Sequence, residues 1–105
     1  MPILLYLLMW FSTPHSVVVN WVDALNPSGT TYNVYRASGT CASGGTFTEV
    51  GNGVSALTYT DANVPLGNLC YYVTAVNSGL EGLPSNKADA AVRPFAPQTV
   101  VVNVN

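Results

Sequence analysis

The chain has 105 residues, of which 49% are hydrophobic and only 8% are charged, and its net charge at pH 7 is −2. This length allows one small domain with a single core, and the high hydrophobic content excludes an intrinsically disordered chain. With three Lys and Arg residues in all, no basic surface for nucleic acid or anionic lipid is expected. So weakly charged a surface is kept soluble by neutral polar groups or is covered by a partner.

The opening segment, PILLYLLMWFSTP at residues 2–14, is an apolar run in a chain that otherwise has few. It lacks the basic residues and the small-residue cleavage site of a signal peptide, and it is too short for a membrane helix. We therefore expect residues 1–14 to provide a first strand or an inter-subunit strand that is apolar on both faces. The large residues of the face left for another chain are Leu4, Tyr6, Leu8 and Trp10. The alternatives are a cleaved export signal and a fragment whose ends belong to missing domains.

Short β-prone runs separated by turn clusters then follow at a spacing of roughly ten residues, which is typical of an all-β domain. The segments 26–29, 52–56 and 78–86 are rich in Gly, Pro, Ser and Asn and are predicted to be turns or loops. The predicted strands are residues 16–22, 31–37, 46–51, 57–61, 69–77 and 87–92.

Two cysteines, Cys41 and Cys70, and one histidine, His15, are too few for a structural zinc site. A single disulfide in an oxidising compartment fits this count, and so do two reduced, buried cysteines in a cytosolic protein.

Five segments together resemble the fibronectin type III family in its bacterial and phage form: HSVVVNW (15–21), YNVYR (32–36), FTEVG (47–51), TYTD (58–61) and CYYVTAVNSGLEGLPSN (70–86). The resemblance covers about residues 15–93 and implies an immunoglobulin-like, seven-stranded antiparallel Greek-key β-sandwich at residues 15–94. The core residues that it implies are Trp21, Tyr32, Val34, Tyr59, Tyr71, Val73 and Ala75.

The same resemblance has an implication for the two cysteines, and the chain departs from the family at two places. Some bacterial members carry a cysteine pair at the positions of Cys41 and Cys70, which implies a disulfide between them. Leu69 stands where the family usually has a corner tyrosine, so the hydrogen bond of that tyrosine is not expected. The loop at 78–86 lacks Arg-Gly-Asp, and integrin-type adhesion is therefore not expected.

Residues 95–105 form a tail that follows the domain and contains no charged residue. Val100, Val102 and Val104 alternate with residues 101, 103 and 105, as in a strand. An uncharged, unpaired strand is suited to pairing with a neighbouring chain. These three valines are therefore predicted to lie between subunits.

Catalysis requires groups that converge, and the acid–base candidates are scattered over different predicted elements. They are His15, Asp23, Glu49, Asp61, Glu81 and Asp89. Neither a catalytic site nor a metal or other cofactor is predicted, and Asp61 is expected to cap a turn, with a weak calcium site shared with Glu81 as the alternative. Tyr35 and Tyr72, on the outer faces of their strands, are candidate ligand-facing aromatic residues.

The sequence therefore predicts a non-enzymatic extracellular module, secreted or located on a cell surface or virion. Its terminal strands would pair with copies of the chain in a fibre, a pilus-like structure or a shell. The alternative is a carbohydrate- or cell-surface-binding accessory module of a secreted enzyme or phage fibre.

Overall fold

The computed structural model describes residues 13–104, which form antiparallel β-sheets and contain no α-helix. These residues contain seven strands and one short 3₁₀ helix, η1 (Cys41–Ser43). The strands are β1 (His15–Asn20), β2 (Thr31–Ser38), β3 (Thr48–Val54), β4 (Thr58–Val64), β5 (Gly67–Asn77), β6 (Leu80–Glu81) and β7 (Ala88–Val92).

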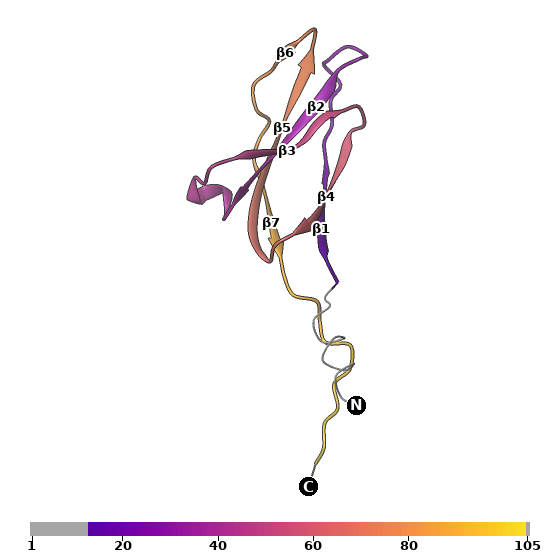
Figure 1. Ribbon diagram of the computed structural model, residues 1–105, viewed down its shortest axis with the longest axis vertical. Coiled ribbons are helices and arrows are strands. Elements are labelled where there is room, and N and C mark those ends of the chain that lie inside the picture. Colours follow the sequence, from indigo (N-terminus) through magenta and orange to yellow (C-terminus); the bar gives the residue numbers. More distant parts are fainter. Residues whose placement is uncertain (1–12, 105) are drawn as a thin grey trace, which may run out of the picture.

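The strands form two sheets that face one another across a shared core (Figure 1). β1 and β4 make the smaller sheet, and the larger sheet has the order β3-β2-β5, with both β6 and β7 on the far edge of β5. β2 and β5 pair over eight consecutive residues, from Thr31 opposite Val76 to Ser38 opposite Leu69. This central pair fixes which side chains of the larger sheet point inward.

The core is built on the inward-facing alternate residues of β2 and β5. Among the predicted core residues, Tyr32, Val34, Tyr71 and Val73 are buried. Leu69, at the position of the family's corner tyrosine, is also buried and is 2% exposed. The other predicted core residues, Trp21, Tyr59 and Ala75, are half-buried and pack against this cluster. The smaller sheet contributes Val64 from β4 and the half-buried Val17 and Val19 from β1.

One side of the space between the sheets is closed by the contact of Tyr59 on β4 with β3. The Tyr59 hydroxyl donates a hydrogen bond to the carbonyl oxygen of Val50 at 2.5 Å. A Cβ atom at Gly51 would lie 2.9 Å from the Tyr59 ring, so only glycine allows this close approach. On the opposite side, β1 and β7 have no hydrogen-bonded pairing in the described part of the chain.

Several strand boundaries differ from the sequence-based prediction. β3 begins two residues later than predicted and continues through residues 52–54, which were predicted to be a turn; β4 likewise extends to Val64. The predicted loop at 78–86 contains β6, because Ser78 and Gly79 adopt positive φ angles of 53° and 76° and form a two-residue hairpin turn. Within one chain no strand is formed in residues 98–104, and the predicted pairing of the tail with a neighbouring chain stays a prediction.

Candidate interaction surfaces

Asp61 lies inside the domain, at the centre of a polar group of three side chains. One carboxylate oxygen of Asp61 accepts hydrogen bonds from Arg36 Nη1 at 2.9 Å and from the Tyr71 hydroxyl at 2.7 Å. Burial, together with the hydrogen bond to Asp61, raises the pKa of Tyr71. The expectation that Asp61 caps a turn is therefore wrong: it lies within β4, is 5% exposed and forms an ion pair.

Glu81 lies on the outer face of the larger sheet and does not meet Asp61. Its carboxylate accepts hydrogen bonds from the Thr74 hydroxyl, the Tyr35 hydroxyl and the Asn33 side-chain amide. The hydrogen bonds from Thr74 and Tyr35 lower the pKa of Glu81, and the bond to Glu81 raises the pKa of Tyr35 to about 12. The structure therefore gives no support to a calcium site shared by Glu81 and Asp61.

The other acid–base candidates bind nearby groups of the framework. Asp23 accepts hydrogen bonds from the Tyr32 hydroxyl at 2.6 Å and the Asn26 side chain at 2.7 Å, which lower its pKa to about 2. Glu49 accepts a hydrogen bond from Asn52. Within residues 13–104 these acids belong to different elements, and none forms an ion pair with His15.

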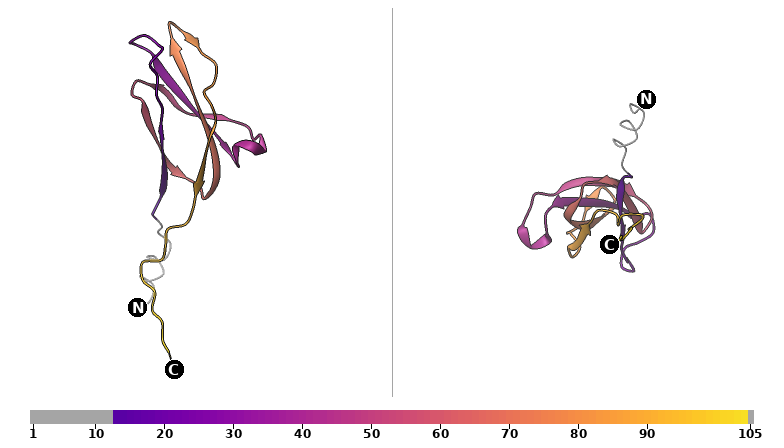
Figure 2. Two further views of the ribbon diagram at one scale, coloured as in Figure 1. Left: turned by 180° about the vertical axis from the view of Figure 1, so that it is seen from behind. Right: turned by 90° about the horizontal axis from the view of Figure 1, so that it is seen from below.

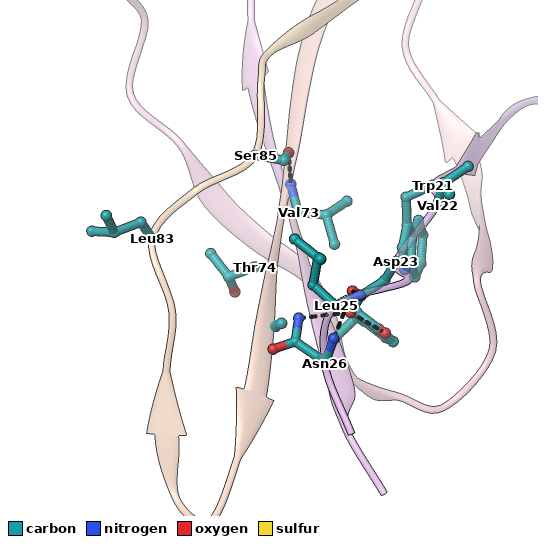
Figure 3. Close-up of a pocket in the computed structure, with 11 residues that line it drawn as sticks. Trp21, Val22, Asp23, Leu25, Asn26, Val73, Thr74, Leu83 and Ser85 are labelled. Carbon is teal, nitrogen blue, oxygen red and sulfur yellow. Dashed lines mark hydrogen bonds between the residues drawn. The ribbon is translucent and has the colours of Figure 1, made fainter. Parts of the chain in front are cut away.

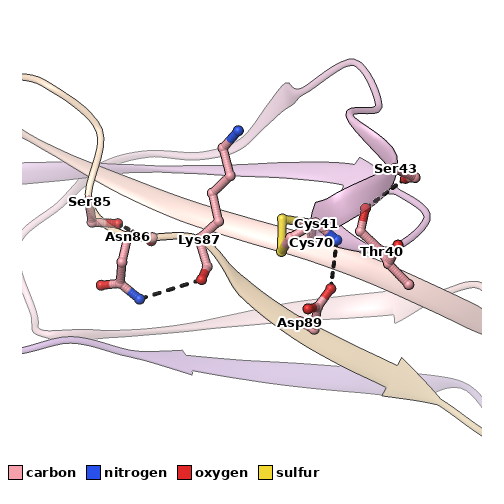
Figure 4. Close-up of a disulfide and its surroundings, with 8 residues drawn as sticks. All are labelled: Thr40, Cys41, Ser43, Cys70, Ser85, Asn86, Lys87 and Asp89. Carbon is pink, nitrogen blue, oxygen red and sulfur yellow. Dashed lines mark hydrogen bonds between the residues drawn. A yellow bond between two sulfur atoms is a disulfide. The ribbon is translucent and has the colours of Figure 1, made fainter.

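Cys41 and Cys70 form the disulfide that the family resemblance implied (Figure 4). Cys70 faces outward from β5, and its Cα atom lies 5.0 Å from that of Cys41 in η1. The backbone N–H of Cys41 donates a hydrogen bond to Asp89 of β7 at 2.7 Å. Cys41, Cys70 and Asp89 are the one close group of metal-ligand residue types in the described chain, and the disulfide occupies both of its sulfur atoms. The disulfide thus fastens the loop before β3 onto β5.

Tyr35 and Tyr72 are brought together on the outer face of the larger sheet. Their rings stack with centroids 4.7 Å apart, and the Phe47 ring meets Tyr72 edge-on at the same distance. The Lys87 ammonium lies 5.2 Å from the centroid of Phe47. These rings therefore form a small packed cluster in which one face of each tyrosine ring is covered by the other tyrosine.

A groove runs between the two sheets on the side where β1 and β7 do not pair. One end of it is a cavity of about 330 Å³ between residues 21–26 and residues 83–85, shown in Figure 3. A second cavity of about 330 Å³ continues it along the end of β1 and shares Trp21, Val22, Val73 and Ser85 with the first. We call this the seam groove, lined by Val19–Asp23, Leu25, Asn26, Tyr71–Ala75, Leu83, Ser85, Asn86 and Ala88, with Tyr32 at its floor.

The seam groove is largely apolar and opens onto the core. Val73 and Tyr71 of its floor belong to the buried cluster, whereas Val22, Leu25 and Leu83 on its walls are each more than 90% exposed. The indole nitrogen of Trp21 is buried there without a hydrogen-bond partner among the described residues. This site was not predicted from the sequence, although an isolated apolar residue within a predicted loop, such as Leu83 in residues 78–86, is a recognisable signal.

The tail presents a second apolar surface. Val100, Val101, Val102 and Val104 are between 75% and 91% exposed. Before them, the Phe95 ring stacks on the His15 ring with centroids 4.0 Å apart, which holds the start of the tail at the beginning of β1. The predicted inter-subunit residues Leu4, Tyr6, Leu8 and Trp10 lie outside the described residues.

Comparison of the chain with models of known protein families and with curated proteins gave no match. In the part of the chain that the structure describes, no helix is long and apolar enough to cross a membrane.

Proposed function

We propose that this protein is a non-enzymatic, extracellular structural module that assembles with copies of itself through its terminal segments. The observation that carries this proposal is the tail, where four large valine side chains in an uncharged segment are exposed to solvent. Single exposed apolar residues are ordinary on a protein surface, but a contiguous exposed apolar segment is typical of an interaction site. Strand pairing with another chain would bury these side chains and satisfy their backbone groups.

The fold proposed for this module is an immunoglobulin-like Greek-key sandwich of the fibronectin type III kind. The two facing antiparallel sheets and the buried Tyr32, Val34, Tyr71 and Val73 support it. The Cys41–Cys70 disulfide supports an oxidising, extracellular location. The absence of an enzymatic role is proposed because the acidic side chains of the described residues bind the framework rather than converge on a cleft.

The alternative, a carbohydrate- or cell-surface-binding module, rests on the cluster of Tyr35, Tyr72 and Phe47. A sugar platform needs free ring faces, and stacking covers one face of Tyr35 and one face of Tyr72, while Phe47 packs edge-on against Tyr72. This packing reduces the ring surface open to a sugar and favours assembly over sugar binding. Retention of the protein on a polysaccharide matrix, abolished by Tyr35→Ala, would reverse that preference.

The test is the oligomeric state of the full chain, measured by sedimentation velocity over a range of protein concentrations. We expect oligomers that grow with concentration, and a monomer for the variant lacking residues 98–105. This deletion keeps Phe95 on His15, and an unchanged free energy of unfolding in urea will show that the domain is intact. A full chain that stays monomeric at every concentration would overturn the proposed function.

A further inference from the structure

The seam groove borders the end of β1 at Val19 and Asn20, and the edge of β1 opposite β4 is unpaired in the described chain. β1 hydrogen-bonds to β4 along its whole length and to no other strand within residues 13–104. The inward-facing Val17 and Val19 of β1 are only half-buried, although they pack on the core. A free strand edge next to a partly uncovered core is a site at which an additional strand can pair.

The shape and polarity of the groove suit an extended, uncharged peptide. Asp23 is the one charged residue that lines it, and its carboxylate is already bound by Tyr32, Asn26 and the backbone of Leu25. An inserted strand would thus cover the exposed apolar side chains of Val22, Leu25 and Leu83 on the groove walls.

The tail has the length and the side-chain pattern to fill this place. Residues 98–104 are seven in number, which is enough to pair with β1 from Asn20 back to Ser16, while His15 is covered by Phe95. Val100, Val102 and Val104 would share one face and cover the core, while residues 99, 101 and 103 would face outward. Because the tail has no charge, its burial leaves no ionised side chain without a partner.

The direction of the tail indicates that its acceptor is a second molecule. Figures 1 and 2 show that residues 96–104 leave the domain at the end where β1 begins and point away from it along the long axis. The end of the seam groove between residues 21–26 and residues 83–85 lies toward the opposite end of the domain, where Figure 1 shows β6. A copy placed ahead in the same orientation would therefore receive the tail at that end of its groove, antiparallel to its own β1.

We propose that residues 98–104 of one copy insert as a strand into the seam groove of the next copy, beside β1, so that the copies join head to tail. This inference rests on the proposed function and identifies the acceptor site and the register of self-assembly. A head-to-tail contact of this kind propagates as a filament unless its rotation closes a ring.

The experiment combines two tail variants of the full chain with hydrogen exchange of the backbone amides, read by mass spectrometry. Val102→Asp places a charge on the face that enters the groove, and Val101→Asp places the same charge on the outward face. Both residues are exposed outside the domain, so neither variant should affect folding. We expect Val102→Asp to be monomeric and Val101→Asp to assemble. Amides of residues 16–20 in the assembled protein should exchange at least about tenfold more slowly than in monomeric Val102→Asp.

The other outcomes separate this inference from the proposed function. If the full chain assembles but exchange in β1 is unchanged, the acceptor is elsewhere: the inference fails and the proposed function stands. If β1 is equally protected in monomeric Val102→Asp, its edge is already paired within one chain and the inference also fails. Equal loss of assembly in both variants would contradict the strand register. A monomeric full chain would overturn both proposals.

Discussion

At the scale of single residues, the interior depends on a carboxylate that the sequence analysis assigned to a turn. Asp61 holds Arg36 and the Tyr71 hydroxyl together inside the core, and it links β4 of one sheet to β2 and β5 of the other. A buried carboxylate that loses its charge leaves a cation without its partner, which costs more than the original pairing contributed. Asp61 should therefore be among the polar residues to which stability is most sensitive.

We expect Asp61→Asn to lower the free energy of unfolding by about 1.5–3 kcal/mol, measured by urea denaturation. The expected loss is below that of a fully buried pair because the Arg36 side chain is 27% exposed to solvent. Glu49→Gln is the matched control, since Glu49 is exposed and its side chain binds only Asn52 among the described residues. Equal free energies of unfolding for the two variants would show that the hydrogen bonds of Asp61 with Arg36 and Tyr71 do not stabilise the fold.

At the scale of elements, the alternation of apolar residues was enough to predict the long strands. Together with the family resemblance, which implied these core residues, it placed Tyr32 and Val34 on one face of β2 and Tyr71 and Val73 on one face of β5. It did not identify β6, whose two residues show no period; the signal was the Ser78-Gly79 turn. Nor could it place Asp61 inward, because that position depends on the Arg36 and Tyr71 partners supplied by other strands.

Among the contacts that join one element to another, the Cys41–Cys70 disulfide should contribute most to stability. It closes a chain segment between residues separated by 29 positions, and constraint of the unfolded chain should be worth about 3–4 kcal/mol. We expect the double variant Cys41→Ala, Cys70→Ala to unfold at a lower urea concentration by that difference in free energy. Its unfolding should not respond to reductant, whereas the reduced natural protein should approach the variant. Identical unfolding midpoints for the variant and the oxidised protein would contradict the predicted contribution.

At the scale of the whole molecule, the two sides of the domain are unequal. Tyr59 closes the side of β3 and β4, while the side of β1 and β7 remains open as the seam groove. The apolar and uncharged character of the tail could be predicted from the sequence, because charge and hydrophobicity are properties of the individual residues. It could not predict the groove, which depends on the relative placement of residues 21–26 and 83–85, far apart in the chain.

Since the tail is uncharged and the groove carries only Asp23, self-assembly should be nearly independent of ionic strength. Raising sodium chloride from about 0.05 M to about 0.5 M should change the dissociation constant less than about twofold. Sodium sulfate should strengthen assembly, because excluded salts favour burial of apolar surface. Sedimentation velocity of the full chain in each salt provides the measurement. Oligomers that dissociate as sodium chloride is raised would indicate a charged interface instead.

The stacking of Phe95 on His15 has a mechanical consequence. It places the point where the chain enters β1 next to the point where it leaves β7 (Figure 2). A pull applied between residues 13 and 95 would therefore act across one end of the domain and separate its edges one contact at a time. A pull transmitted through a strand lying along β1 would instead load many backbone hydrogen bonds in shear at once. The same domain would then yield easily under tension on its own ends and resist tension along a chain of joined copies.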